Sequence, residues 1–428
     1  MLFRSLRANG RAGSFAALLQ AVEQARIEGM QPVDFVAHDL TQPVAAQSVV
    51  RVELLNMLNR PVAGTLHARL GGLKLRPISE VKLAAHVRKT VELTIEDGAA
   101  EPSNDYPLAL QFDAGPDGLA FHHETLHVNR IARRSITVDG KLDDWTGVLP
   151  QTIATDGRIN RTDAEVAWKP FEPFSLTAKK GLATAYLAHD DQYFYFAAKV
   201  ADDTPDEGTL RFETRNDDEF FYPEKVQQSD RKGGLTEVTW PAGVRRYSYA
   251  KNPVLPSGNN PNFDNLQIAF NAVSEDEKPW YPFPPGTFRG YTGYVCTDYE
   301  YGLNTVSPRY GGGTEIWRLR HPKLPYKHFY PRQPKSPMDG AVKDGKLVTR
   351  REGNSRIVEC AIPWSEIPHV KARRDAGLPV KFTYRVNDNA GVGCLELAKE
   401  RSVSKQNNFA FLVRWTEHWA NEVEFVFE

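Results

Sequence analysis

The sequence has few cysteines, no long apolar run and no excess of either charge. Its 428 residues include only three cysteines, Cys296, Cys360 and Cys394, which cannot all pair and lack the close spacing of a zinc site. The 53 basic and 54 acidic residues give a net charge of −1, so no basic field exists to collect nucleic acid or anionic lipid. No apolar stretch reaches the length of a membrane span. We therefore expect at most one disulfide, no nucleic-acid partner and no membrane span.

A signal peptide is also missing from the printed sequence. The first residues include basic side chains but no sustained apolar core and no convincing cleavage site. This beginning is more typical of a chain that starts partway through a longer polypeptide, and we expect an upstream domain.

Aromatic residues and turn formers are plentiful instead. The chain contains 16 Tyr, 22 Phe and 8 Trp together with 29 Pro and 31 Gly. That mixture favours many short strands joined by turns, with aromatic side chains left over for a surface. The length is sufficient for two or three domains.

Residues 1–31 hold the clearest helical pattern. Phe15, Leu18, Leu19 and Val22 have the i, i+3, i+4, i+7 spacing of one helix face. A single amphipathic helix has nothing of its own to pack on. It therefore either packs on the following domain or forms the tail of an upstream one.

Residues 32–132 change to a period of two, which predicts strands. Apolar residues alternate with polar ones in three clear runs, around Val50–Leu54, Leu66–Leu70 and Val91–Ile95. About seven such segments separated by turn clusters predict an immunoglobulin-like β-sandwich. The stretch VELLNMLNRPVAGTLHARL also resembles the Ig-like linker domains that accompany sugar-binding and glycosidase domains, which implies a spacer.

Residues 133–428 contain five markers in a fixed order. They are Ile136-Thr-Val-Asp-Gly-Lys-Leu-Asp-Asp-Trp145, the hairpin Ala183-Thr-Ala-Tyr-Leu-Ala-His-Asp-Asp-Gln-Tyr-Phe-Tyr-Phe196, the strand Asp264-Asn-Leu-Gln-Ile-Ala-Phe270, the pair Glu359-Cys-Ala-Ile-Pro-Trp364 and Phe382-Thr-Tyr-Arg-Val-Asn-Asp388, and the closing strand Val423-Glu-Phe-Val-Phe427. In sequence and spacing they resemble the family 9 carbohydrate-binding modules and their DOMON-like relatives. The resemblance implies a second, elaborated β-sandwich, so we expect an all-β chain of two sandwiches with a short N-terminal helix.

Two departures from the family's pattern bear on its ligand. The segments 208–262 and 272–318 are far longer than the family's loops, and Gln267 stands where the family often has Glu. Both segments are rich in Pro, Asn and aromatic residues, which favours ordered loops over disorder.

The resemblance also implies a sugar-binding site. In family 9 modules two Trp side chains sandwich the terminal sugar, and one of them precedes the closing strand. Trp415 occupies that place here, with Trp419 as the alternative register. The second Trp has no match at the family's spacing, and the substitutes in the insertions are Trp240, Trp280 and Tyr281. The expected partners for sugar hydroxyls are Gln267, Arg385 and Asn387. For Trp415, plain packing is the alternative.

An acidic loop gives a candidate metal site. Asp202, Asp203 and Asp206 lie within five positions, and Ca²⁺ prefers the oxygen ligands that such loops supply. Family 9 modules can carry structural calcium, so the resemblance implies it here. A solvated, charge-rich turn is the alternative, and no cofactor is required.

His123-Glu-Thr-Leu-His127 matches the H-E-x-x-H pattern of zinc proteases. That chemistry needs a helix, which places the two His one turn apart. Here the surrounding alternation predicts a strand, in which residues four apart are separated by about 13 Å. We therefore expect the final strand of the Ig-like domain rather than a zinc site.

Together these features favour non-catalytic binding of a poly- or oligosaccharide, as the accessory region of a larger extracellular or periplasmic carbohydrate-active enzyme. The alternatives are a glycoside hydrolase activity of its own and a purely structural docking module. A haem-binding module and a zinc protease have the least support.

Overall fold

The computed structural model describes residues 31–154, 182–203, 205, 207, 264–273, 298–308, 311–324, 340–388, 393–397 and 423–428, together with four short strands between 220 and 246. The predicted N-terminal helix, with its pattern from Phe15 to Val22, lies outside these ranges. The described chain is mostly β, as predicted. Among its described helices, none is long and apolar enough to cross a membrane.

The chain divides into two compact units, residues 1–127 and 128–428. The sequence pattern places the boundary at 132/133 instead. The difference arises because Arg130–Arg133 form a strand that pairs in parallel with two strands of the second unit.

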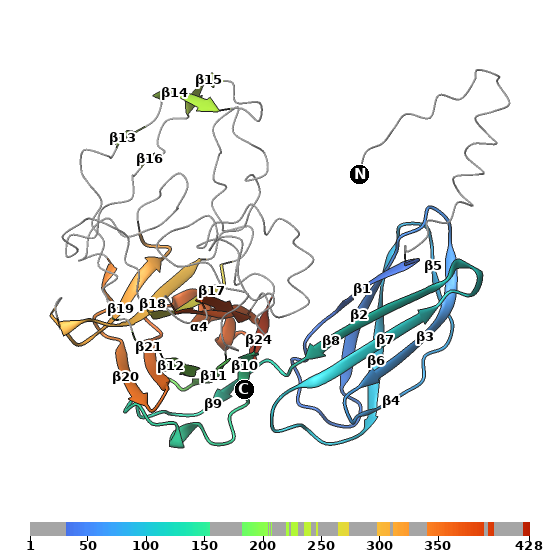
Figure 1. The fold of residues 1–428 in the computed structure, drawn as a ribbon, viewed down its shortest axis with the longest axis horizontal. Coiled ribbons are helices and arrows are strands. Elements are labelled where there is room, and N and C mark those ends of the chain that lie inside the picture. The colour runs from blue at the N-terminus through green and yellow to red at the C-terminus, as the bar shows by residue number, and fades with distance from the viewer. Residues whose placement is uncertain are drawn as a thin grey trace. The chain divides into compact units, whose positions relative to one another are not determined.

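The first unit consists of two four-stranded antiparallel sheets (Figure 1). Their orders are β1-β2-β6-β4 and β5-β3-β7-β8. The strands are β1 Val33–Ala37, β2 Val49–Asn56, β3 Val62–Leu70, β4 Lys74–Leu75, β5 Val81–Leu83, β6 Arg88–Asp97, β7 Tyr106–Asp113 and β8 Leu119–Leu126, with a 3-10 turn at Gly115–Asp117.

The period-two runs form strands as predicted, with their apolar members buried. Val52, Leu54, Leu93 and Ile95 are all fully buried. An immunoglobulin-like topology for this unit stays a prediction.

The H-E-x-x-H segment lies on strand β8, so the prediction of a strand is confirmed. His123 is exposed on this strand, while His127 follows its last residue. Glu124 pairs within its own strand, with Oε1 2.6 Å from His122 Nε2, because residues two apart share a face. His127 instead lies 3.3 Å from Asp105 and 3.6 Å from Asp39. The two histidines of the motif therefore have separate surroundings.

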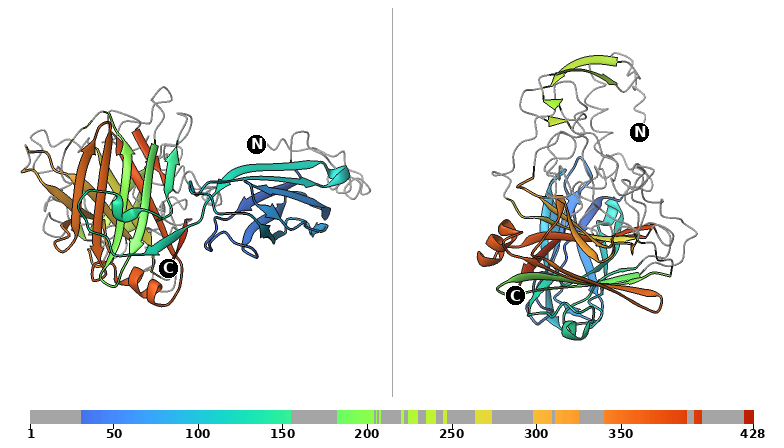
Figure 2. Two further views of the ribbon diagram at one scale, coloured as in Figure 1. Left: turned by 90° about the horizontal axis from the view of Figure 1, so that it is seen from below. Right: turned by 90° about the vertical axis from the view of Figure 1, so that its left-hand side faces the viewer.

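The second unit is built on one large sheet that folds back on itself (Figure 2). Its order is β19-β18-β17-β22-β24-β9-β11-β12-β21-β20, with β10 paired to β11 and β23 to β22. The strands are β9 Arg130–Arg133, β10 Gln151–Ala154, β11 Leu182–His189, β12 Tyr193–Ala201, β17 Asn265–Asn271, β18 Tyr299–Thr305, β19 Thr314–Arg320, β20 Lys346–Glu352, β21 Ser355–Pro363, β22 Val380–Asp388, β23 Gly393–Glu396 and β24 Glu424–Phe427. The remaining elements are the helix α4 Pro368–Asp375 and a 3-10 turn at Asp143–Trp145. Two two-stranded sheets are also described, one of β13 Phe220–Phe221 with β16 Arg245–Arg246 and one of β14 Glu224–Ser229 with β15 Leu235–Trp240.

We name the two parts of this sheet half A (β9, β11, β12, β21 and β20) and half B (β24, β22, β17, β18 and β19). They join where β24 pairs with β9. Their far edges also meet, since Thr314 Oγ1 donates to the Leu347 carbonyl at 3.0 Å and Val342 N donates to the Ile316 carbonyl at 3.0 Å. The sheet is therefore barrel-like, with its core enclosed between the halves.

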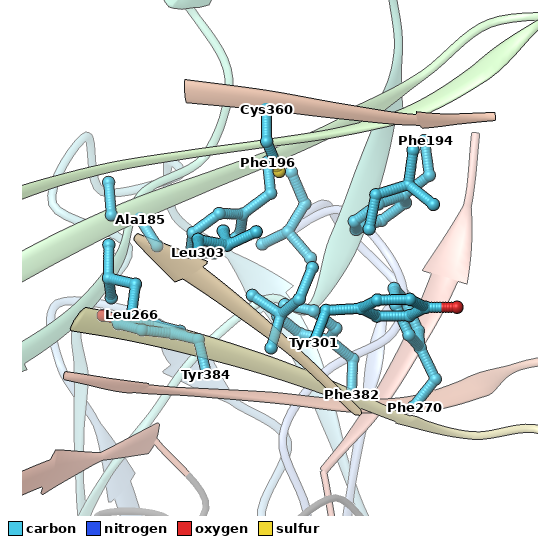
Figure 3. Close-up of a cluster of buried hydrophobic side chains, with 14 of the residues drawn as sticks. Ala185, Phe194, Phe196, Leu266, Phe270, Tyr301, Leu303, Cys360, Phe382 and Tyr384 are labelled. Atoms are coloured by element: carbon cyan, nitrogen blue, oxygen red, sulfur yellow. The ribbon is translucent and has the colours of Figure 1, made fainter. Parts of the chain in front are cut away.

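Aromatic side chains fill this core (Figure 3). Phe194 and Phe196 of half A point toward Phe270, Phe382 and Tyr384 of half B. Their ring centroids lie 5.0 to 6.0 Å apart in tilted or edge-on pairs, the geometry that aromatic quadrupoles favour. Cys360 is a free, buried thiol in the same cluster, and burial raises its pKa.

The first two sequence markers form a loop and a turn that connect strands of this barrel. Residues 136–148 cross the outer face of half A, where Trp145 is buried. Glu359 of β21 holds that loop: it accepts the Trp145 indole N–H and the backbone N–H groups of Asp139 and Gly140, each at 2.8 Å. Gly140 is required there because its φ is +81° and a Cβ would come within 2.9 Å of Val348.

Asp190 of the hairpin marker lies in the turn between β11 and β12 and stabilises it. Asp190 Oδ1 accepts the backbone N–H groups of Gln192 and Tyr193, at 2.7 and 2.9 Å, and Oδ2 accepts the Tyr195 hydroxyl at 2.7 Å. Trp364 packs on the same turn, since its indole N–H donates to the Asp190 carbonyl. Trp145 and Trp364 are thus core residues, 2% and 4% exposed.

The segment 272–318, expected to be an insertion, contributes two strands to the barrel. It contains β18 and most of β19, joined by a turn in which Gly311, Gly312 and Gly313 all have positive φ. The glycine run is therefore a tight turn before a strand, and the strands around it belong to half B.

Candidate functional site

The outer face of half B is polar and buried. Along β17, Leu266, Ile268 and Phe270 face the core, so the alternate residues face outward. Yet Gln267 and Ala269 of that outward set are both 0% exposed. An outward sheet face is usually solvated, and a polar face that is buried needs an explanation.

Strand register places a row of side chains across this face. Gln267 lies opposite Arg385 on β22 and opposite Gly302 on β18, and Gly302 lies opposite Trp317 on β19. Directly opposed residues project to the same face of a sheet and lie close together. The row therefore runs Trp317, Gly302, Gln267, Arg385, and all four residues are buried.

Charged groups on the same face are paired. Arg320 Nε lies 3.6 Å from Glu300 Oε2, and the two side chains are 1% and 0% exposed. Asn304 donates its amide N–H to Glu315 Oε1 at 3.0 Å. A buried ion pair is retained only where geometry or function requires it, since desolvation consumes most of its attraction.

Gln267 differs from these neighbours. Among the residues that the structure describes, neither its amide oxygen nor its amide nitrogen has a hydrogen-bond partner. The Trp317 indole N–H is in the same state. Leaving a buried polar group unpaired costs about 1–3 kcal/mol. A primary amide carries one acceptor and two donor hydrogens, so this position is equipped to bind a polar ligand.

An ionic cluster lies beside the N-terminal end of β17. Arg356 of β21 stands between Asp202 Oδ2, at 3.7 Å, and Asp264 Oδ2, at 3.9 Å. Arg351 donates to Asp202 Oδ2 at 2.8 Å and to the Asp202 carbonyl at 2.6 Å. These contacts tie the end of β12 to the start of β17, joining half A to half B.

The predicted calcium loop starts at this cluster. Asp202 is buried and committed to two guanidinium groups, while Asp203 is exposed and Asp206 lies outside the described residues. Over the described parts of the chain, no group of three or more His, Cys, Asp or Glu side chains could hold a metal ion. Calcium at this loop stays a prediction.

A second cluster of titratable groups lies on the core side of half B, below α4. Glu366 accepts two hydrogen bonds from Arg318, at 2.6 and 2.7 Å, and one from the Tyr301 hydroxyl at 3.1 Å. Burial and the Glu366 charge raise the pKa of Tyr301, while burial lowers the pKa of His321, whose ring bonds the Glu366 carbonyl at 2.9 Å. Every polar group named here has a partner, which is the arrangement of a structural network.

The structure brings two of the predicted sugar-binding residues together. Gln267 and Arg385 are directly opposed on neighbouring strands. Asn387 lies two residues further along β22, opposite Asn265, and Trp240 ends strand β15. The remaining candidates lie outside the described residues: Trp280, Tyr281, Trp415 and Trp419.

Sequence reasoning missed Gly302, Trp317 and the Glu300–Arg320 pair. The available signal was the alternation in Tyr299-Glu-Tyr-Gly-Leu-Asn-Thr305, whose tyrosines and leucine face the core. Assigning this stretch to an insertion concealed it.

No protein-family model matches the chain, and no curated protein matches it by sequence. Among solved structures it is similar to a family 9 carbohydrate-binding module from Caldicellulosiruptor kristjanssonii in complex with cellotriose. That match has 11% identity and a TM-score of 0.33, and covers 70% of this chain and 93% of that one. It is also similar to a partial N-terminal region of an enterococcal surface protein (8% identity, TM-score 0.18, 87% and 96% of the two chains). An uncharacterized Listeria monocytogenes protein solved with glucose, magnesium and calcium follows (11%, 0.17, 84% and 32%). The residues of half B, rather than these likenesses, carry the function proposed next.

Proposed function

We propose that the second unit binds a carbohydrate on the outer face of half B, without catalysing its cleavage. The observation that carries this proposal is the Gln267 side chain, fully buried and with neither amide atom paired among the described residues. Sugar hydroxyls both donate and accept hydrogen bonds, so an amide can bind two neighbouring hydroxyls at once. Binding would supply the partners whose absence costs stability in the free protein.

Two neighbours support a sugar over other polar ligands. Arg385, directly opposite Gln267, carries a planar guanidinium on the same face of the sheet. Planar polar groups and aromatic rings in one concave site are the usual equipment of small-ligand recognition. For the stacking rings we propose Trp415, with Trp419 as the alternative, as the family 9 resemblance implies.

The wider role is part of the same proposal. Binding would serve a larger carbohydrate-active enzyme outside the cytoplasm, with the first unit as a spacer. A carbohydrate-binding role in which this chain also hydrolyses its ligand is the alternative. Release of nitrophenol from aryl glycosides by the purified chain would favour that alternative.

The chain offers a matched pair for the test. Gln151 of β10 is also a glutamine with 0% exposure, but its amide N–H donates to the Val128 carbonyl at 3.0 Å. The wild type, Gln267→Met and Gln151→Met would be applied to a glycan array and then titrated calorimetrically with cellotriose and the best-retained oligosaccharide. We expect wild-type binding to survive in Gln151→Met and to fall at least tenfold in Gln267→Met. An array that stays silent with the wild type, or equal binding by both variants, would reject the proposal.

A further inference from the structure

Gly302 occupies an unusual place for a glycine, in the middle of β18. A glycine inside a strand weakens it, and commonly marks a bulge or a close approach by a ligand or another backbone. The bulge in the pairing of β18 with β19 lies between Glu300 and Tyr301, while Gly302 itself pairs in regular register with Trp317. A bulge therefore does not account for this glycine, which leaves close approach as its explanation.

The position faces the unpaired amide. Gly302 and Gln267 are directly opposed, so no side chain of residue 302 stands beside the Gln267 amide. On the opposite side of the same row stands Trp317, about 9.6 Å from Gln267 across two strand spacings. Ala269, diagonal to Gly302, is a second small residue of this face and lies opposite Glu300.

The Trp317 side chain points away from Gly302. Its ring packs onto Gly340, where an added Cβ would come within 2.1 Å of Cζ2. Residues 340–341 border β19 on the side that β18 does not occupy, because Ala341 bridges Trp317 there. The indole is therefore held against Gly340 rather than against Gly302.

We infer that Gly302 is the floor of the sugar site and sets which ligands fit: one sugar ring lies directly on the β18 backbone at Gly302, with two adjacent hydroxyls bound by the Gln267 amide. The amide oxygen accepts from one hydroxyl and the amide nitrogen donates to its neighbour. This inference rests on the proposed function and narrows it, since it selects sugars whose ring presents a pair of neighbouring hydroxyls at one edge. Any side chain at position 302 would occupy the space of the ring.

The test adds a methyl group at this position. Gly302→Ala and Gly302→Val would be titrated with cellotriose and with the best-retained oligosaccharide of the array. We expect at least tenfold weaker binding for Gly302→Ala and none for Gly302→Val, while the thermal midpoint stays level or rises, because alanine and valine suit a strand better than glycine. The control is Gly72→Ala, where an added Cβ meets nothing within 4 Å and φ does not lie in the left-handed region; it should bind as the wild type does.

Hydrogen exchange of the wild type gives a second measurement that needs no variant. Saturating oligosaccharide should slow exchange in peptides covering 265–271 and 299–305, and leave 183–189 unchanged. If Gly302→Ala binds like the wild type, or if the ligand protects other peptides instead of these two, a sugar ring does not lie on Gly302. The proposed function would still stand in that case, provided that Gln267→Met fails to bind. If the wild type itself binds no sugar, both are wrong.

Discussion

Halves A and B of the barrel-like sheet both bury polar groups on their outer faces, but they satisfy those groups differently. In half A, Glu359 is 0% exposed and receives three N–H groups from the loop that covers it. In half B, Gln267 is equally buried, and neither amide atom is paired among the described residues. The first arrangement holds a fold together. The second imposes a cost on the fold, which a ligand can remove.

In half A, hydrogen bonds to the carboxylate of Glu359 offset the cost of burying it. Burial raises the pKa of Glu359, and the hydrogen bonds from Trp145, Gly140 and Asp139 counteract the rise. The charged form is therefore costly to bury and is kept because three donors depend on it. No comparable set of donors converges on Gln267 among the described residues, so stability alone does not explain the retention of its amide.

The largest effect should follow from removing the anchor of half A. Glu359→Leu leaves the Trp145 indole and two backbone N–H groups buried without an acceptor, and should lower the free energy of unfolding by about 3–5 kcal/mol. All eight tryptophans lie in the second unit, so tryptophan fluorescence in a denaturant titration follows that unit alone. Trp145→Phe, which removes one of the three donors, is the control and should lose less. A Glu359→Leu protein as stable as the wild type would remove the basis of the comparison.

Smaller changes in the free energy of unfolding, of opposite sign, should distinguish the two buried glutamines. Gln151→Met leaves the Val128 carbonyl without its donor and should destabilise the second unit by about 1–3 kcal/mol. Gln267→Met removes two unpaired polar atoms at similar shape, so its stability should stay level or increase by about 1 kcal/mol. The same fluorescence titration measures both. Should Gln267→Met prove the less stable of the two, Gln267 would be a structural residue and the two halves would be alike.

The sequence predicted those parts of the fold in which a local turn requires a particular residue type. Asp190, Gly140 and Trp145 belong to turns that need those residue types, so a short pattern was enough to place them. Gln267 and Arg385 were predicted from the strand markers of the family 9 resemblance, and their role in binding stays a prediction. Strand β18 was missed although Tyr299, Tyr301 and Leu303 alternate with polar residues, because the segment around it was assigned to an insertion. The pairing of Gly302 with Gln267 is a long-range register, which no local pattern contains.

The smallest effect concerns two histidines, one in each half. His189 of β11 lies 3.1 Å from the Glu428 carbonyl and packs edge-on against Trp364, and burial lowers its pKa, as it does for His321 beside β19. Since the folded state disfavours the charged form, the unfolded chain takes up protons first as the pH falls below about 6.5. Stability should be complete above that pH and decline below it, by at most about 1.4 kcal/mol per pH unit for each histidine.

Denaturant titrations between pH 8 and 5.5 test this dependence, with His189→Gln and His321→Gln each expected to flatten it. Glu359 works in the opposite direction, because a raised carboxyl pKa favours the folded state as the pH falls. The single variants therefore isolate each histidine better than the wild-type profile does, and His123→Gln, which changes an exposed side chain of the first unit, is the control for the substitution itself. If the free energy of unfolding depends on pH with the same slope in both histidine variants, His321 beside half B is a structural group like those of half A. The unpaired amide of Gln267 would then mark a ligand site within half B rather than a general looseness of that half.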